Sequence, residues 1–167
     1  MPTAEGREEI AALRMDSPIG VLCLCASREG ILLVGKESGI APLPPAKQEG
    51  LAWEMAARCK RELEEYFAGK RKAFDLPLDL KSDSPFSQSV YRAVAKIPYG
   101  ETRSYREIAE EIGDGKASRA VGMALHRNRI LILIPCHRVV SSSGSLGGFA
   151  LGIEAKKTLL SMEKSTF

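Results

Sequence analysis

The chain has 167 residues, of which 44% are hydrophobic and 27% are charged, a composition typical of a folded globular protein rather than a disordered one. No apolar run approaches the ~20 residues of a membrane-spanning helix, and the acidic, polar segment Met1–Ile10 has no signal-peptide core. These features argue against a membrane or secreted protein. We therefore expect no membrane partner and a cytoplasmic location, or a nuclear one in a eukaryote.

The net charge of +3 is unevenly distributed along the chain. Residues 1–85 carry a net charge of −2 and residues 86–167 a net charge of +5. A basic half is a weak indication of a polyanionic partner. Solvated surface lysines explain the same surplus equally well.

The first half predicts a small α/β domain. A hairpin is expected from a turn at Asp16–Gly20, a strand at Val21–Ala26, a second turn at Ser27–Gly30 and a returning strand at Ile31–Val34. Ile40–Pro45 is proline-rich and predicts a loop. Apolar residues at helical spacing predict a helix over Trp53–Phe67, ended by Gly69. Phe74–Leu80 alternates around Pro77 and predicts a short edge strand.

The second half is predicted to be mostly helical. Ser84-Pro85 starts a helix over Phe86–Lys96, whose expected buried face is Phe86, Val90, Ala93, Val94 and Ile97. Ser104 and Glu107 have the spacing of a capping box, which predicts a helix over Tyr105–Ile112. A glycine-containing turn separates it from a helix over Lys116–Arg127, and this pair has the helix-turn-helix pattern. We place a linker at 81–85, between domains 1–80 and 86–167.

The second helix of that pair is rich in small residues, and Arg119 lies among them. Ala117, Ser118, Ala120, Gly122 and Ala124 are all small. One interpretation is close packing against another helix. The other is close approach of the helix to DNA with Arg119 free to insert, since the minor groove is only about 6 Å wide.

A cysteine and a histidine are adjacent in the string Ile134-Pro135-Cys136-His137-Arg138-Val139. The thiolate is the reactive form of cysteine, and an imidazole beside it favours that form. The alternative is a buried structural cysteine next to a histidine that caps a turn. Cys23, Cys25 and Cys59 lie on a predicted strand and helix, so we expect reduced thiols. With only two histidines, His126 and His137, and no paired CxxC motifs, we expect no zinc site and no cofactor.

The whole string resembles the active-site signature of the O6-alkylguanine–DNA alkyltransferases. The resemblance extends over residues 86–163, and the motifs that carry it occur in family order: Pro98-Tyr99-Gly100, Ser104-Tyr105, Ser118-Arg119-Ala120-Val121-Gly122, Asn128, Ile134–Val139 and Gly147–Lys156. Asp16–Gly20 also resembles the family's first hairpin. The resemblance implies an RNase H-like α/β N-terminal domain and a mostly α C-terminal domain with a helix-turn-helix. It implies a DNA-repair protein that transfers an alkyl group from a flipped-out guanine in double-stranded DNA irreversibly onto its own cysteine.

The resemblance also implies roles for individual residues. Cys136 would attack the alkyl carbon, His137 would take the thiol proton through a water, and Glu163 would orient His137. Asn128 would tie the second helix to the active-site segment, and Tyr105 would contact the flipped base. Further residues are expected at the DNA or the base: Arg119 in the base stack, Ser118, Ala120 and Gly122 along the minor groove, and Val139, Phe149 and Ala150 around the base. We read Arg138 as a partly buried ion-pair partner and His126 as a solvent-facing or phosphate-near residue. We expect a monomer.

The sequence departs from the family's commonest pattern at four positions. Arg129 and Leu131 replace prolines that are common there, Phe149 stands where tyrosine is frequent, and Ala150 where serine is common. Two other functions are compatible with parts of the pattern. A cysteine hydrolase could use Cys136, His137 and Glu163, although its base normally comes from a separate segment. A non-enzymatic DNA-binding regulator could use the helix-turn-helix, but the second helix has few side chains able to read base edges.

Overall fold

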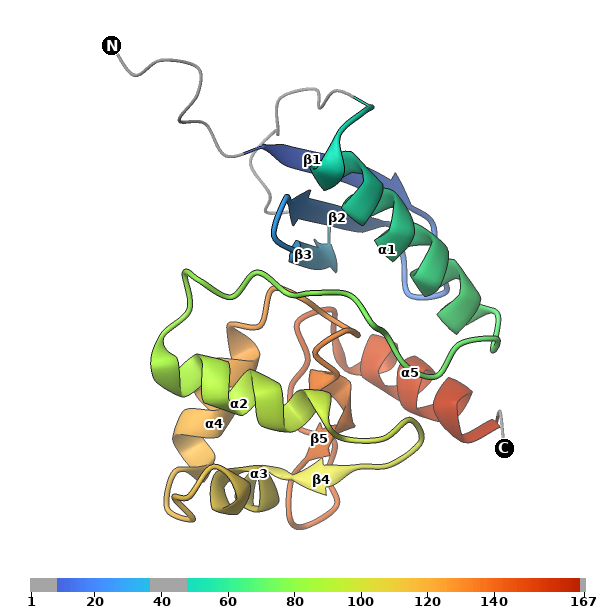
Figure 1. Ribbon diagram of the computed structural model, residues 1–167. Helices are drawn as coiled ribbons and strands as arrows, with labels where there is room; N and C mark the ends of the chain where they lie inside the picture. Colours follow the sequence, from blue (N-terminus) through green and yellow to red (C-terminus); the bar gives the residue numbers. More distant parts are fainter. Residues whose placement is uncertain (1–8, 37–47, 166–167) are drawn as a thin grey trace.

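The computed structural model describes residues 9–36 and 48–165 and has two parts (Figure 1). The first part is an antiparallel sheet of three strands, β1 Ile10–Met15, β2 Leu22–Ser27 and β3 Ile31–Lys36, in the order β1-β2-β3. β2 is buried along its whole length, as expected for the central strand of a covered sheet. The predicted hairpin is confirmed as β2 and β3. The predicted loop at Ile40–Pro45 lies outside the described residues.

Helix α1, Leu51–Phe67, packs on the sheet through contacts with β1 and β2. Its buried face, Ala52, Ala56, Cys59, Leu63 and Tyr66, repeats at helical spacing. Gly69 has a φ of 75° and its N–H donates to the carbonyl of Tyr66, so it ends the helix as predicted. Cys23 and Cys25 lie on β2 and Cys59 on α1, and all four cysteines are free and buried.

One strand was not predicted, and two expectations for this half and the start of the next need correction. β1 was not predicted, because its sequence IAALRM lacks a clear alternation of apolar and polar residues. The strand predicted at Phe74–Leu80 is reduced to one parallel bridge between Leu78 and Ile31, since Pro77 has no N–H to extend the ladder. Phe86 was expected in the buried face of its helix but is 38% exposed, because the face turns away from the core in the first helical turn.

The second part is helical. Helix α2, Pro85–Ala95, begins at the N-cap Ser84, whose hydroxyl accepts a hydrogen bond from the Ser87 N–H, with Pro85 in its first turn. Val90, Ala93, Val94 and Ile97 are buried as predicted. Helix α3, Tyr105–Glu111, begins with the predicted capping box of Ser104 and Glu107. Helices α4, Ser118–His126, and α5, Ile153–Ser165, complete this part.

Two pieces of β-structure connect these elements to the cysteine segment. β4, Arg103–Ser104, pairs in parallel with β5, Val139–Val140, so the start of α3 lies beside the residues that follow the nucleophile candidate. The edge strand β3 pairs through Val34 with Ile130: the Val34 N–H donates to the Arg129 carbonyl at 2.9 Å and the Leu131 N–H to the Val34 carbonyl at 3.0 Å. The sheet of the first part therefore supports the segment that leads to Cys136. No helix among the described residues has the length and apolar character needed to cross a membrane.

Candidate active site and DNA-binding face

The segment before Cys136 makes two sharp turns. Ile132 is buried and has a φ of 72°, and around it the Leu133 N–H donates to the Leu131 carbonyl at 2.8 Å. A positive φ is unfavourable for a β-branched residue, so the surrounding core must hold it in place. At Pro135 the Cys136 N–H donates to the Ile134 carbonyl at 2.7 Å. One turn of 3-10 helix, Cys136–Arg138, follows these turns.

Asn128 fixes this segment from the end of α4. Its Nδ2 donates to the Ile134 carbonyl at 3.1 Å and its Oδ1 accepts from the Ile130 N–H at 2.9 Å. Its side chain also hydrogen-bonds to Cys136. Asn128 is buried, so these bonds take the place of water for an amide that would otherwise be costly to bury. The tie between the second helix and the cysteine segment that the sequence predicted is therefore present.

His137 and Glu163 form a buried pair next to the cysteine. His137 Nε2 lies 2.9 Å from Glu163 Oε1, and both side chains are essentially without solvent exposure. Arg138 donates to both oxygens of the same carboxylate, from Nη2 at 2.7 Å to Oε1 and from Nε at 3.1 Å to Oε2. Its Nη1 also donates to the Ile97 carbonyl at 2.7 Å. Arg138 is thus the ion-pair partner that was predicted, and it is more deeply buried than expected.

A fourth group reaches this carboxylate from the first part of the chain. Tyr66, on α1, donates its hydroxyl to Glu163 Oε1 at 3.0 Å. The two residues are 97 positions apart in the sequence, and no motif links them. Sequence reasoning missed Tyr66 for that reason. It also missed Lys156, which is completely buried and donates to the Val139 carbonyl at 2.8 Å.

Burial and hydrogen bonding set the protonation of the buried groups. Burial disfavours the charged form of Glu163, but hydrogen bonds from His137 and Arg138 outweigh it and lower the pKa of Glu163 to about 2. Burial lowers the pKa of His137, against the raising effect of Glu163, so the imidazole is neutral at pH 7. Because the ionised Glu163 accepts a hydrogen bond from Nε2–H of His137, the free lone pair of the imidazole is on Nδ1. This nitrogen is buried and has no hydrogen-bond partner among the described residues.

Cys136 itself is a protonated thiol in this environment. Burial raises its pKa, and the hydrogen bond from Asn128 and the charge of Lys156 oppose that shift. The thiol lies at a cavity of about 210 Å³, lined also by Tyr105 from α3, by Gly122, Leu125 and His126 from α4, and by Gly148, Phe149 and Ala150. The ring of Phe149 is edge-on to His137, with centroids 6.4 Å apart. A protonated thiol followed in the chain by a neutral histidine with an unpaired ring nitrogen is a candidate pair of nucleophile and base.

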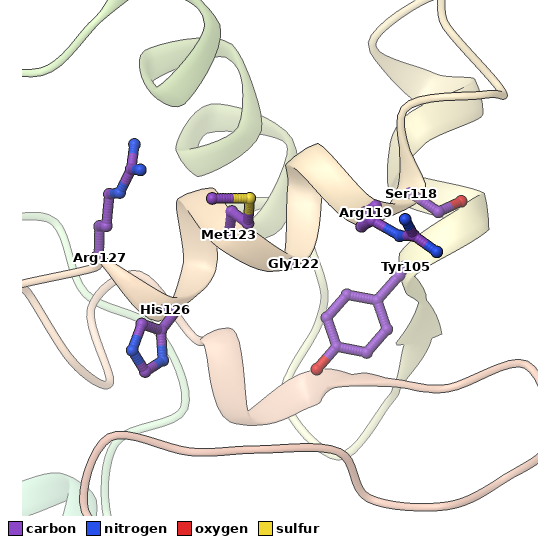
Figure 2. A pocket seen from close by; sticks show the side chains of 7 residues that line it. All are labelled: Tyr105, Ser118, Arg119, Gly122, Met123, His126 and Arg127. Carbon is purple, nitrogen blue, oxygen red and sulfur yellow. The ribbon is translucent and has the colours of Figure 1, made fainter.

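Tyr105, Gly122 and His126 line both this cavity and a second, larger hollow on the outer face of α4 (Figure 2). That hollow, of about 630 Å³, is lined by Tyr105, Ser118, Arg119, Gly122, Met123, His126 and Arg127. Figure 2 shows Arg119 and Ser118 near one end of the helix, and His126 and Arg127 at the other. Arg119 and Ala120 are exposed, and His126 faces solvent as predicted.

The small residues of α4 lie on both its buried and its exposed sides. Ala124 is buried, and its carbonyl accepts from the Tyr91 hydroxyl of α2 at 2.7 Å, so it belongs to a helix–helix contact. A Cβ at Gly122 would lie 3.8 Å from the Tyr105 ring, an ordinary contact distance, so the ring lies against the helix at this position and an alanine would also fit. Ala120 is instead exposed on the outer face. Of the other predicted residues, Val139 is buried, Phe149 is half-buried and Ala150 is exposed at the cavity.

Comparison with known proteins agrees with this architecture. Residues 13–80 match the ribonuclease-like domain of 6-O-methylguanine DNA methyltransferase, and residues 85–165 match the DNA-binding domain of that family. Methylated-DNA–protein-cysteine methyltransferase of Methanosarcina acetivorans is 44% identical over 154 residues, which cover 90% of this chain and 96% of the relative. The Mycobacterium leprae protein of that name is 44% identical over 151 residues, with 90% of both chains covered.

Solved structures show the same fold. The O6-methylguanine methyltransferase of Mycobacterium tuberculosis superposes with a TM-score of 0.83 at 39% identity, over 95% of this chain and 94% of the other. A crystal structure of that bacterium's protein in complex with DNA superposes with a TM-score of 0.81 at 40% identity, over 92% of both chains. The predicted fold class is confirmed, with an α/β ribonuclease-like first domain and a helical DNA-binding second domain. The chain belongs to the 6-O-methylguanine DNA methyltransferase family.

Proposed function

We propose that this protein repairs DNA by moving the alkyl group of an O6-alkylguanine irreversibly onto Cys136. The observation that carries the proposal is the buried Cys136 thiol at the floor of a cavity, with the His137–Glu163 pair behind it. The relatives that cover nine-tenths of the chain are named for alkyl transfer from methylated DNA to a protein cysteine. That reaction needs a nucleophile, a base and a proton donor, and the site supplies all three without a metal or cofactor.

The reaction begins with loss of the thiol proton. His137 is neutral, and its unpaired Nδ1 accepts the Cys136 proton, directly or through one water. Glu163 stabilises the resulting imidazolium through Nε2, which is the role of an orienting carboxylate. The thiolate sulfur then attacks the alkyl carbon. A sulfur–carbon bond forms, the bond from that carbon to guanine O6 breaks, and the electron pair leaves with the base.

Tyr105 is the proposed proton donor to the departing base. Burial and the neighbouring Cys136 raise the pKa of its hydroxyl, so the phenol keeps its proton at pH 7. The hydroxyl protonates the base as negative charge develops on it, and the proton held by His137 returns the tyrosine to its neutral form. The products are an unmodified guanine and a thioether on Cys136. Nothing in the site would cleave a thioether, so each protein molecule acts once.

The guanine edge is proposed to bind backbone groups at the cavity. The carbonyls of Cys136 and Val139 and the N–H of Ala150 are the expected partners. The Cys136 carbonyl already accepts from the Val139 N–H, and the Val139 carbonyl from Lys156. Each carbonyl oxygen has a second lone pair, so it can accept a bond from the base as well. Phe149, half-buried against His137, would contact the ring of the base.

DNA is proposed to bind along the outer face of α4 through its minor groove. Ser118, Arg119 and Gly122 line the hollow there, and exposed Ala120 leaves room for close approach of the sugar-phosphate backbone. A paired guanine cannot reach a buried thiol, so the nucleotide must be extruded, at a cost of a few kcal/mol. Arg119 is placed to fill the vacated position in the stack. We also propose that the protein acts as a monomer.

We also retain the proposed division into domains 1–80 and 86–167 with a linker at 81–85. The family matches to residues 13–80 and 85–165 support that division.

The test is intact-protein mass after incubation with duplex DNA containing one O6-methylguanine. We expect the mass of one methylene unit to be gained, and peptide mapping to place it on the peptide with Cys136. Cys136→Ala should gain no mass and still bind the duplex within a few-fold of the unmodified protein, with affinity falling as salt rises. Methyl transfer to Cys23, Cys25 or Cys59, product beyond one equivalent, or a Cys136→Ala protein unable to bind DNA would refute the proposal. Multiple turnover would favour a hydrolase, and DNA binding without mass gain would favour a regulator.

A further inference from the structure

Lys156 is a buried cation at the back of the active site. Its side chain is completely inaccessible to solvent, and no carboxylate among the described residues forms an ion pair with it. Its ammonium group instead donates to three backbone carbonyls: Val139 at 2.8 Å, Gly148 at 3.4 Å, and Leu146 in closer contact. An ammonium group has three N–H donors, so these three carbonyls can satisfy it fully. Burying a charge without a counter-ion is costly, and such a group calls for an explanation.

The three carbonyls belong to two different segments of the chain at the Cys136 cavity. Val139 directly follows the 3-10 turn that contains Cys136 and His137. Leu146 and Gly148 lie in the loop that leads to Phe149, and Gly148, Phe149 and Ala150 of that loop line the cavity. The backbone–backbone hydrogen bonds within residues 141–152 close turns inside that loop. Among the hydrogen bonds of the described residues, those of Lys156, which projects from α5, therefore tie the loop to the nucleophile segment, beside the ring contact of Phe149 with His137.

The same ammonium group acts electrostatically on Cys136. The titratable groups that line the cavity of the thiol, adjoin it or act on it electrostatically are Tyr91 from α2, Tyr105 from α3, His126 from α4, the adjacent His137, and Lys156 from α5. Arg138 and Glu163 face His137 and neutralise each other. The phenols are neutral and His137 is neutral at rest. Burial lowers the pKa of Lys156 and the neighbouring Cys136 opposes that shift, while three backbone carbonyls accept hydrogen bonds from its ammonium form. A positive charge close to a thiol favours the thiolate, here against the opposing effect of burial.

We propose that Lys156 is a positioning residue that holds the loop lining the alkyl-acceptor pocket against the nucleophile segment and that favours the Cys136 thiolate through its buried charge. The proposal rests on alkyl transfer to Cys136 as the function of the site. Its electrostatic part concerns the thiol itself, however, and can be measured without any alkylated guanine.

The experiment compares Lys156→Met, Lys156→Gln and Lys156→Arg with Lys157→Met. Lys157 is the next residue on α5, is exposed and pairs with Glu154, so its replacement makes the same change in net charge outside the site. Two rates are measured on each folded protein. One is carbamidomethylation of Cys136 by iodoacetamide as a function of pH, followed by peptide mass. The other is methyl transfer from the free base O6-methylguanine and from duplex DNA.

We expect Lys156→Met and Lys156→Gln to react with iodoacetamide about tenfold more slowly at pH 7, with the rate profile displaced to higher pH. Lys156→Arg keeps the charge and should keep the profile. Lys156→Gln keeps donors for the carbonyls and should melt closer to the unmodified protein than Lys156→Met does. Methyl transfer should slow by a similar factor on free base and duplex alike, because the defect precedes base extrusion. Lys157→Met should match the unmodified protein in every measurement.

A Lys156→Gln profile that superposes on those of Lys156→Arg and the unmodified protein would overturn the electrostatic role, whether or not Lys156→Met folds. Normal methyl transfer by a folded Lys156→Gln or Lys156→Met would overturn the positioning role. A failure of the proposed function looks different, because the unmodified protein would then transfer no methyl group while the iodoacetamide profiles still differed.

Discussion

Gly147 and Tyr105 are in such close contact that a Cβ atom added at Gly147 would lie 2.7 Å from the Tyr105 hydroxyl oxygen. Gly147 has a φ of 71°, and it belongs to the loop that Lys156 holds against the cavity. The absence of a side chain at position 147 therefore determines where the Tyr105 hydroxyl lies. Because Tyr105 is the proposed proton donor, this glycine controls a group that acts in the reaction without touching the substrate itself.

Gly147→Ala should therefore displace the Tyr105 hydroxyl and slow methyl transfer by about tenfold to a hundredfold, the scale of a lost or misplaced general acid. Gly144→Ala is the matched control, because Gly144 has a φ of 87° and open space around its Cβ position. Both variants carry the backbone cost of alanine at positive φ, on the order of 1 kcal/mol. The measurement is the single-turnover rate on duplex and on free O6-methylguanine. Equal rates for the two alanine variants would show that the contact with Tyr105 has no functional consequence.

The bond from Tyr66 to Glu163 should matter for stability as well as for the site. Tyr66→Phe removes one of the donors to a buried, ionised carboxylate and leaves the ring packing in place. Hydrogen bonds to charged groups contribute about 1.5–3 kcal/mol, so urea unfolding at pH 7 should show a loss of that order. His137 and Arg138 still hold the carboxylate, so methyl transfer should fall by less than about tenfold. A stability unchanged within error would mean that the Tyr66 hydroxyl adds nothing to the network.

The same carboxylate and its histidine give the protein a defined sensitivity to acid. His137 has a pKa below its ordinary 6.5 in the folded state, so the unfolded chain binds a proton more readily and stability falls as pH drops below 6.5. Glu163 has a folded pKa of about 2 against an ordinary value of 4.5, so its contribution is complete above pH 4.5 and is lost between pH 4.5 and 2. The Glu163 shift corresponds to on the order of 3 kcal/mol.

Urea unfolding measured from pH 8 to pH 3 should therefore show a decline that begins below pH 6.5 and steepens below pH 4.5. His137→Gln should remove the first part of the decline, whereas His126→Gln, at an exposed position, should not. A decline below pH 6.5 that survives in the His137→Gln protein would assign it to another group.

Local signals in the sequence predicted much of this fold. The capping box at Ser104, the N-cap at Ser84 and the glycine at position 69 act within a few residues of themselves, so a reader of the sequence can find them. The strand β1 and the exposure of Phe86 were missed because both depend on which surfaces the rest of the chain packs against. The Phe74–Leu80 strand was overextended because alternation alone does not reveal that Pro77 interrupts the ladder.

The residues of the candidate site also fall into those that the sequence predicted and those that it did not. The family resemblance implied the Cys136–His137 string and its relation to Glu163, Asn128 and Arg119. The structure brings Glu163 and Asn128 to that string. Tyr66 could not be found from sequence, because an isolated tyrosine on an amphipathic helix is indistinguishable from a core residue. Lys156 was equally hidden, since a lysine in a charged helix is ordinarily exposed, and only its burial reveals a role.

Arg119 provides the sharpest test of DNA recognition. It is exposed at the edge of the hollow on α4 and lies near Tyr105, so it is placed to occupy the stack after a guanine has left (Figure 2). That task exists only for duplex DNA. Arg119→Ala should slow methyl transfer from duplex strongly, by about a hundredfold if the arginine offsets around 3 kcal/mol of the cost of extrusion, and should barely change transfer from the free base.

Arg127→Ala is the matched control, because Arg127 lines the same hollow at the other end of α4. A simple phosphate contact predicts weaker binding to all DNA, a shallower salt dependence and near-normal transfer at saturating DNA, which is the result we expect for Arg127→Ala. Melting curves confirm that both variants fold. If Arg119→Ala behaved like Arg127→Ala, or slowed duplex and free base equally while remaining folded, Arg119 would be a backbone contact or part of the pocket, and another residue would have to take the place of the extruded base.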